Sequence, residues 1–136
     1  MNFAYTPKVE ALRARINAFM TEHIVPRIRL WHEEIEQGQF PVSFMDPLKS
    51  RAREHGLWNL FLPGLREEEP GTRLSNLEYA PLAEIMGRVA WASEVFNCNA
   101  PDTGNMELLH MFATPEQYEQ WLRPLLQGEI RSAFAM

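Results

Sequence analysis

The sequence predicts an all-α protein of about six helices packed as an antiparallel bundle, with the start of a β-strand at its C-terminal end. Helix-capping signals begin several segments, and apolar residues within these segments recur three or four positions apart. Glycine and proline residues separate the segments by short connections, which favours neighbouring helices in one bundle. With 136 residues and a hydrophobic fraction of 46%, the chain is large enough to bury one core.

The first and longest helix is predicted to begin at Thr6, which can cap it, with Pro7 in the first turn. Its apolar residues recur at helical spacing in two sets, which are Val9, Leu12, Ile16 and Phe19, then Ile24, Ile28, Trp31 and Ile35. The step from Phe19 to Ile24 breaks the phase of the pattern, and Pro26 lacks a backbone donor. We therefore expect a kink near Pro26.

A second, shorter helix is predicted from Asp46 to His55, and Gly56 ends it. The apolar run of residues 57–65 is too short and too broken by proline for a helix, so we expect it to pack as an extended segment against the core. Residues 66–73 are charged and contain a proline and a glycine, which is typical of an exposed loop.

A third helix begins at a capping box formed by Ser75 and Glu78, and Pro81 is an awkward residue in its interior. Its apolar residues are Leu77, Leu82 and Ile85. A fourth helix carries Trp91, Val95 and Phe96, and a fifth carries Met106, Leu109 and Phe112.

The sixth helix has the clearest start signal in the chain. Thr114 can cap it, Pro115 suits its first turn, and Gln117 completes a capping box. Its apolar face is formed by Tyr118, Trp121, Leu122, Leu125 and Leu126, and Gly128 closes it. Residues 130–136 then alternate in character, as the beginning of a β-strand does.

Composition excludes several classes of function. The net charge of −5 argues against binding to nucleic acid, which needs clustered basic residues. No segment approaches the ~18 continuous apolar residues that a membrane span requires, and no secretory signal precedes the first helix. The single cysteine, Cys98, cannot form an intramolecular disulfide, so we expect a reducing, cytoplasmic location in a bacterium.

Other candidate sites are better explained as ordinary surface or core residues. His32 and Glu36 share a helical face, but two ligands do not complete a metal site, so no metal is expected. The run Glu67–Glu69 is interpreted as a solvated charge cluster in a loop. Cys98 has no neighbouring histidine signature of a nucleophile and is expected to pack as a small residue.

Two stretches of the sequence resemble the acyl-CoA dehydrogenase family. The run from Ala100 to Met136, APDTGNMELLHMFATPEQYEQWLRPLLQGEIRSAFAM, resembles the family's helix, capped helix, glycine and first strand in that order. The segment GLWNLFLP, Gly56 to Pro63, resembles the loop after the family's second helix. The resemblance implies that residues 1–129 form the family's N-terminal helical domain and that residues 130–136 begin the first strand of a β-domain.

The resemblance also implies which residues contact ligands. Residues 134–136 look like the opening of the family's flavin-binding strand, which normally continues with Thr, Glu and Pro, so the cofactor FAD would be bound by Phe134, Ala135 and Met136. The acyl-chain side of the substrate cavity would be lined by Phe96, Asn99, Ala100, Thr103 and Gly104. No catalytic residue is expected in the chain, because the family's catalytic glutamate lies further downstream than Met136.

The implied reaction oxidises the α,β bond of an acyl-CoA thioester to the trans-2-enoyl-CoA, with a glutamate taking the α proton and the flavin accepting the hydride. The family also implies a homodimer or homotetramer and an electron-transfer flavoprotein as acceptor. The 136 residues by themselves are expected to be inactive. The alternative is a non-catalytic helical interaction module, or a degenerate relative, if the native chain ends at Met136. A helical regulator of nucleic acid is disfavoured by the net charge.

Overall fold

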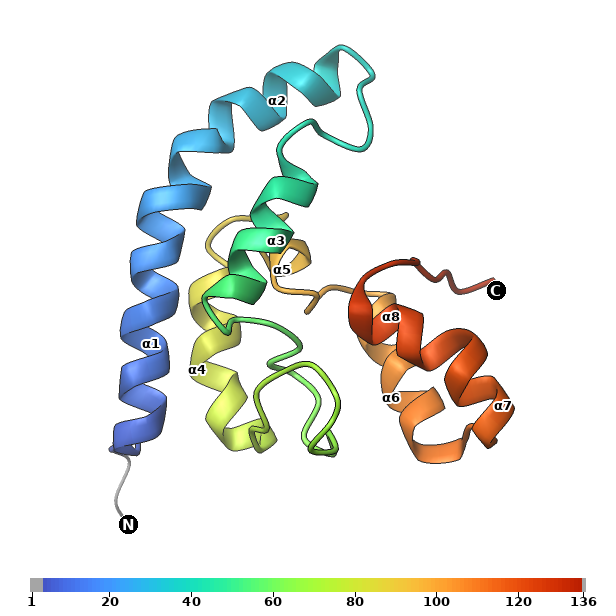
Figure 1. Ribbon diagram of the computed structural model, residues 1–136. Coiled ribbons are helices and arrows are strands. Elements are labelled where there is room, and N and C mark those ends of the chain that lie inside the picture. Colours follow the sequence, from blue (N-terminus) through green and yellow to red (C-terminus); the bar gives the residue numbers. More distant parts are fainter. Residues whose placement is uncertain (1–3, 136) are drawn as a thin grey trace.

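The computed structural model describes residues 4–135, and six helical segments make up this part of the chain (Figure 1). The first segment is a continuous rod of α1 (Pro7–Phe19), the π-helical η1 (Met20–Ile24), the 3-10 helical η2 (Val25–Arg27) and α2 (Ile28–Glu36). The next four are α3 (Met45–Glu54), α4 (Asn76–Met86), α5 (Ala92–Val95) and α6 (Asp102–Phe112). The last comprises α7 (Pro115–Gln117), the π-helical η3 (Tyr118–Leu122) and α8 (Arg123–Gln127). The predicted all-α fold class is confirmed.

The predicted helix starts are present. The Thr6 side chain accepts a hydrogen bond from the Val9 amide, and both reciprocal hydrogen bonds of the capping box are formed at Ser75 and again at Thr114. Gly128 follows α8 with a left-handed backbone (φ 67°), as expected for the residue that ends a helix. These features follow from residues within one helical turn of each other, which is why the sequence alone reveals them.

The expected kink is a change of helix type across two turns. A π turn adds one residue to the helical repeat, so Phe19 and Ile24 face the same side, and both are buried in the core. Val25–Arg27, which includes Pro26, then forms a 3-10 turn before α2 begins. The rod bends at this point in Figure 1 and carries α2 over the start of α3.

Helix directions divide the fold into antiparallel and parallel pairs. The rod is antiparallel to α3, because Phe19 contacts the His55 ring just after α3 and Glu34 binds Ser43 just before it. By contrast, α1 and α4 run in the same direction: Lys8 pairs with Glu78 at their starts, and an Arg88 side chain donates to Asn17 at their ends. The long connection between α3 and α4 returns the chain to the starting end of α1, which makes this parallel pairing possible.

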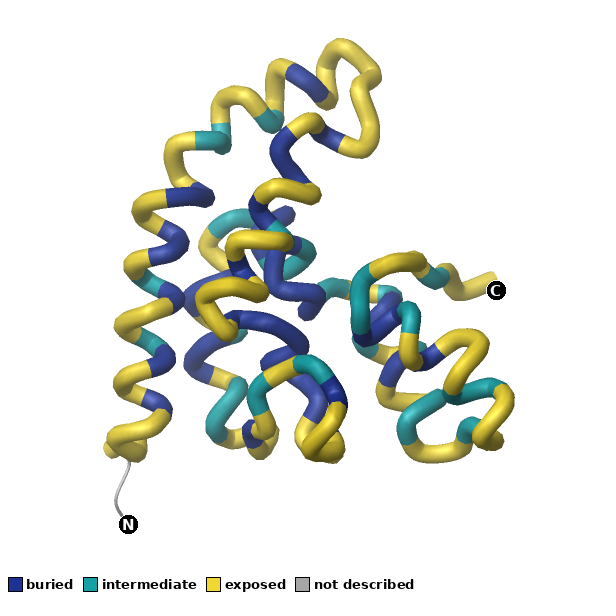
Figure 2. Tube along the Cα trace, in the orientation of Figure 1, coloured by how far each residue is buried: buried dark blue, intermediate teal, exposed yellow. Residues whose placement is uncertain are grey.

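The core lies between α1, α3, α4 and the segment 57–65, as the buried stretches in Figure 2 show. Leu57, Leu60 and Leu62 are 0–2% exposed, so this predicted non-helical segment does pack against the core. Leu77 differs from the other apolar residues predicted in the third helix, because its side chain is 85% exposed. It lies on the outer side of α4, away from the buried Leu82 and Ile85.

Two buried asparagines join the α6–α8 hairpin to the rest of the molecule. Asn59 and Asn97 both adopt left-handed backbone conformations (φ 47° and 54°), which asparagine tolerates better than most residues. The Asn97 side chain donates to the Asn59 side chain at 2.7 Å and to the Leu125 carbonyl at 3.0 Å. Asn59 and Trp58 both donate to the Leu126 carbonyl. Side chains from the 57–65 segment and from the turn after α5 therefore donate hydrogen bonds to carbonyls near the end of α8.

Residues 131–135 follow an irregular course after α8, and the described residues contain no strand. A strand is defined by its hydrogen-bonded neighbours, and no neighbouring strand lies in this part of the structure. The expectation that residues 130–136 begin a β-domain stays a prediction. In the described part of the chain, none of the helices combines the length and the apolar character needed to cross a membrane.

Candidate functional site

The five residues predicted to line the substrate cavity do not share one surface. Phe96 is 0% exposed and contacts the ring of Phe19, with ring centroids 5.2 Å apart. Asn99 and Thr103 are half-buried, and Ala100 and Gly104 are exposed. These four flank the start of α6, where the Asn99 carbonyl accepts the Thr103 amide at 3.1 Å. The candidate wall is therefore the beginning of α6, with Phe96 in the core.

The structure brings a predicted cofactor residue onto this wall. The Phe134 ring lies over Gly104, where an added Cβ would be 3.9 Å from the ring atom Cε2. Phe134 is 62% exposed and Ala135 is also exposed. Met136 lies outside the described residues, so its predicted role is not placed. Residues predicted separately for the substrate and for the cofactor thus meet at the first turns of α6.

Backbone groups beside this wall are free to bind a polar heterocycle. Within the described residues, no hydrogen bond joins the backbone of residues 133–135 to other parts of the protein. Exposed amide and carbonyl groups of this kind suit the polar edge of a flavin ring, and the adjacent Phe134 ring suits its apolar face. The residues present therefore fit the cofactor that the family resemblance implies.

Sequence reasoning missed the residue that fixes this segment. Asp102, in the first turn of α6, is 1% exposed, and its carboxylate accepts hydrogen bonds from Arg131 and Ser132. The Ser132 amide donates at 2.7 Å and its hydroxyl at 2.6 Å, while the Arg131 Nε donates to the other carboxylate oxygen. A buried carboxylate is tolerated because it is paired and hydrogen-bonded. No local pattern in the sequence links residues this far apart.

A chain of alternating charges extends from this carboxylate to α3. The Arg131 guanidinium also contacts Glu94 of α5 at 2.5 Å, and Glu94 accepts from Lys49 of α3 at 3.0 Å. On the other side, the Asn105 side-chain amide donates to the Ser132 hydroxyl at 2.8 Å. Two helices, α5 and α6, therefore hold residues 131 and 132 directly, and Lys49 of α3 supports Glu94.

An apolar groove adjoins the wall. Its volume is about 300 Å³, and it lies between α6, η3 and the C-terminal segment. Its lining residues are Asn105, Leu108, Leu109, Trp121, Leu125, Ile130, Arg131, Ser132 and Ala133. Several large apolar side chains near it are exposed, among them Leu108 (54%) and Trp121 (45%). An apolar surface of this kind is suited to contact with hydrocarbon or with another protein surface.

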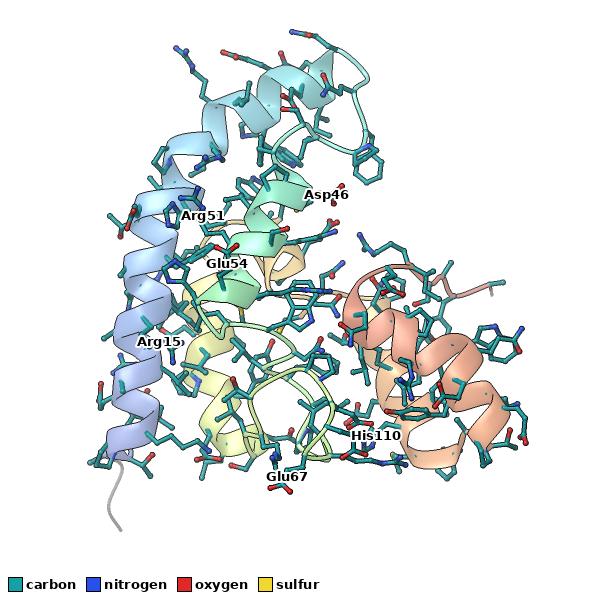
Figure 3. All side chains as sticks on the ribbon, in the orientation of Figure 1. Arg15, Asp46, Arg51, Glu54, Glu67 and His110 are labelled. Atoms are coloured by element: carbon teal, nitrogen blue, oxygen red, sulfur yellow. The ribbon has the colours of Figure 1, made fainter. Side chains whose placement is uncertain are left out.

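A second polar cluster lies at the other end of α6. Figure 3 labels His110 there, facing the loop that also carries the exposed Glu67. Glu69 of that loop is buried, which differs from the expected solvated run, and accepts from the Tyr118 hydroxyl at 2.7 Å and the Arg66 amide at 2.6 Å.

These contacts shift two pKa values. Burial by itself would raise the pKa of Glu69, but the hydrogen bonds from Arg66 and Tyr118 outweigh it and hold the pKa below its usual value. Burial and the bond to the carboxylate raise the pKa of Tyr118 to about 12. Both groups thus keep their ordinary charge states at neutral pH, and the cluster is a structural junction between loop and hairpin.

Two other candidates are the Cys98 thiol and possible clusters of metal-ligating side chains. Cys98 is buried, and burial raises the pKa of its thiol to about 12, so the reactive thiolate is suppressed. Among residues 4–135, no three side chains of His, Cys, Asp or Glu gather closely enough to hold a metal ion.

Comparisons with known proteins agree with the geometry. Residues 6–129 match the family model described as "Acyl-CoA dehydrogenase, N-terminal domain". A Mycobacterium tuberculosis protein named "Probable acyl-CoA dehydrogenase FadE2" is 48% identical over 142 aligned residues, covering 100% of this chain and 33% of the relative. The human "Acyl-CoA dehydrogenase family member 11" is 42% identical over 140 residues, covering 98% of this chain and 17% of the relative.

A solved structure from Mycobacterium abscessus, assigned to the acyl-CoA dehydrogenases, is similar as well. It superposes with a TM-score of 0.82 at 45% sequence identity, covering 95% of this chain and 34% of that one. The chain thus spans about a third of the length of the mycobacterial proteins it matches. The family model, the relatives and the fold all lead to one conclusion: the chain belongs to the acyl-CoA dehydrogenase family and corresponds to its N-terminal helical domain.

Proposed function

We propose that this helical domain forms one wall of the acyl and flavin cavity of an FAD-dependent acyl-CoA dehydrogenase. The enzyme would oxidise the α,β bond of an acyl-CoA thioester to the trans-2-enoyl-CoA. The observation that carries the proposal is the placement of Phe134 over Gly104, because it joins the predicted cofactor segment to the predicted substrate wall. The membership of the chain in the family supports the reaction class.

Each part of the wall has a proposed role. The exposed backbone of Ala135, with Phe134 and Met136, would hold the flavin ring, and bound FAD would supply the hydride acceptor. The start of α6 would face the acyl chain through Asn99, Ala100, Thr103 and Gly104. Phe96 can support this wall only from the core, because its side chain is fully buried. The proton-abstracting glutamate is expected outside these residues, so residues 1–136 by themselves would be inactive.

Further properties belong to the same proposal. An electron-transfer flavoprotein would reoxidise the flavin, and the full-length enzyme would form a homodimer or homotetramer. The exposed apolar groove beside α6 is suited to contact with further parts of such an enzyme. We also propose a cytoplasmic location, on the strength of the unpaired Cys98 and the bacterial relative.

The full-length product of the native gene tests the proposal. It should purify with the visible absorbance of bound FAD, and acyl-CoA should bleach that absorbance and reduce an artificial electron acceptor. The codons that follow Met136 should read Thr-Glu-Pro. A full-length product without flavin that reduces no acceptor with acyl-CoA thioesters of several chain lengths would contradict the proposal. That result would favour the non-catalytic interaction module instead.

A further inference from the structure

The most heavily bonded buried charge beside the wall is Asp102. Asp102 is 1% exposed, and within the described residues its carboxylate accepts hydrogen bonds from the two neighbouring residues Arg131 and Ser132. One carboxylate oxygen accepts the Arg131 Nε, and the other accepts both the amide and the hydroxyl of Ser132. These three bonds fix a backbone amide as well as two side chains, so they define where the chain runs.

We call these three hydrogen bonds from Arg131 and Ser132 to Asp102 the clamp, and two further contacts support it from the other side. Arg131 also contacts Glu94, and Asn105 donates to the Ser132 hydroxyl at 2.8 Å. Ionic hydrogen bonds are roughly twice as strong as neutral ones, and several of them acting on adjacent residues restrict both position and direction. The two residues are therefore anchored to α5 and to α6.

The anchored residues lie directly before the segment that the function needs. Phe134 is two residues beyond Ser132, which in an extended chain corresponds to roughly 7 Å. Its ring rests over Gly104, in the same helix as Asp102. The position of the ring and of the free backbone groups at residues 133–135 therefore depends on an anchor one to three residues away.

We propose that Asp102 is a positioning residue, which sets the course of residues 133–135 and thereby the contacts that this segment makes with the flavin. This inference rests on the proposed function for the identity of the ligand. The clamp itself is independent of any ligand. The chemistry of Asp102 requires no proton transfer, because the carboxylate acts as a fixed acceptor.

The experiment compares variants of the full-length protein. Asp102→Ala removes the three hydrogen bonds that the carboxylate accepts, and Asp102→Asn keeps an acceptor for Ser132 but loses the charge that pairs with Arg131. Asp46→Ala and Asp46→Asn are matched controls, because Asp46 is also a first-turn carboxylate of a helix but is exposed. Arg131→Lys is a milder second variant, since lysine lacks the planar fork of donors that reaches two carboxylates.

Amide hydrogen exchange of residues 131–135 measures the clamp. Asp102→Ala should speed exchange of the Ser132 amide by about tenfold or more, because its acceptor is lost. Asp102→Asn should have a smaller effect, and the Asp46 variants none. Unchanged exchange in Asp102→Ala would overturn the clamp. If Asp102→Ala does not fold, Arg131→Lys takes its place in both measurements and should show the intermediate effect.

The visible spectrum of bound FAD and the kcat of the enzyme measure how residues 133–135 are positioned. The visible spectrum of bound FAD should shift in Asp102→Ala, and kcat should fall by about 10- to 100-fold with little change in KM, as expected when reacting groups are misplaced. An unchanged spectrum and kcat alongside faster exchange would overturn the positioning role and leave the proposed function intact. A wild-type protein without bound FAD would overturn the proposed function together with the flavin role, and the exchange data would still report the clamp.

Discussion

Replacing Asn97 separates a side-chain contribution from a backbone contribution at one buried position. Its side chain, in a residue 5% exposed, donates to Asn59 at 2.7 Å and to the Leu125 carbonyl at 3.0 Å. Its backbone has a φ of 54°, which glycine adopts freely and alanine does not. Asn97→Gly removes only the hydrogen bonds, whereas Asn97→Ala also strains the backbone.

The expected magnitudes follow from these contacts. Asn97→Gly leaves the buried Asn59 side-chain oxygen without a donor, which costs about 1–3 kcal/mol. The Leu125 carbonyl keeps the Gly128 amide as a donor, so losing its second bond costs only about 1 kcal/mol more, and we expect a total loss of about 2–4 kcal/mol of unfolding free energy. Alanine in the left-handed region adds roughly 1 kcal/mol to that loss. Because a domain has only about 5–15 kcal/mol of stability, both variants should unfold far more easily.

Urea unfolding followed by tryptophan fluorescence measures both losses. With an unchanged slope m of about 2 kcal/mol/M, the midpoint for Asn97→Gly should fall by roughly 1–2 M, and the midpoint for Asn97→Ala should be lower still. Asn76, exposed in the first turn of α4, is the matched control, because alanine there should be more stable than glycine. Equal or higher stability of Asn97→Ala relative to Asn97→Gly would refute the reasoning.

Three further predictions follow from burial and charge. Because the pKa of Glu69 is held below its usual value, the ionised carboxylate stabilises the fold at pH values above the ordinary pKa of about 4.5. This contribution is lost as the pH falls through the lowered pKa. The unfolding free energy, measured at decreasing pH, should therefore fall more for wild type than for Glu69→Gln. Leu82→Ala should lower the unfolding free energy by about 2–5 kcal/mol in urea unfolding, because Leu82 is buried. Leu77→Ala should change it by less than ~0.5 kcal/mol, because Leu77 is 85% exposed. Similar losses for the two variants would contradict the assigned buried face of α4. Gly128→Ala should lower the thermal midpoint by several degrees, about 4 °C or more, because its Cβ would lie 2.8 Å from the Trp58 ring on a left-handed backbone; an unchanged midpoint would argue against this contact.

The candidate site was predictable in part. The resemblance in residues 100–136 located the start of α6 and the segment at Phe134, and the structure brings Phe134 to Gly104. The same reasoning grouped Phe96 with the surface residues, although its ring is buried against Phe19. Asp102 was overlooked, because its partners lie 29 and 30 positions along the chain and no spacing rule joins them.

The sequence by itself determined where helices begin and end. Caps such as Thr6, Ser75 and Thr114 bond within one turn, so three or four consecutive residues carry the whole signal. Only the tertiary structure decided which polar groups are buried and what satisfies them. Glu69 lies in a segment predicted to be an exposed loop, and Asp102 lies at the start of a helix. The burial of both depends on hydrogen-bond donors that the fold brings from distant positions in the sequence. Burial of a charge is a property of the assembled surfaces, because the cost of desolvation is offset only where those donors arrive.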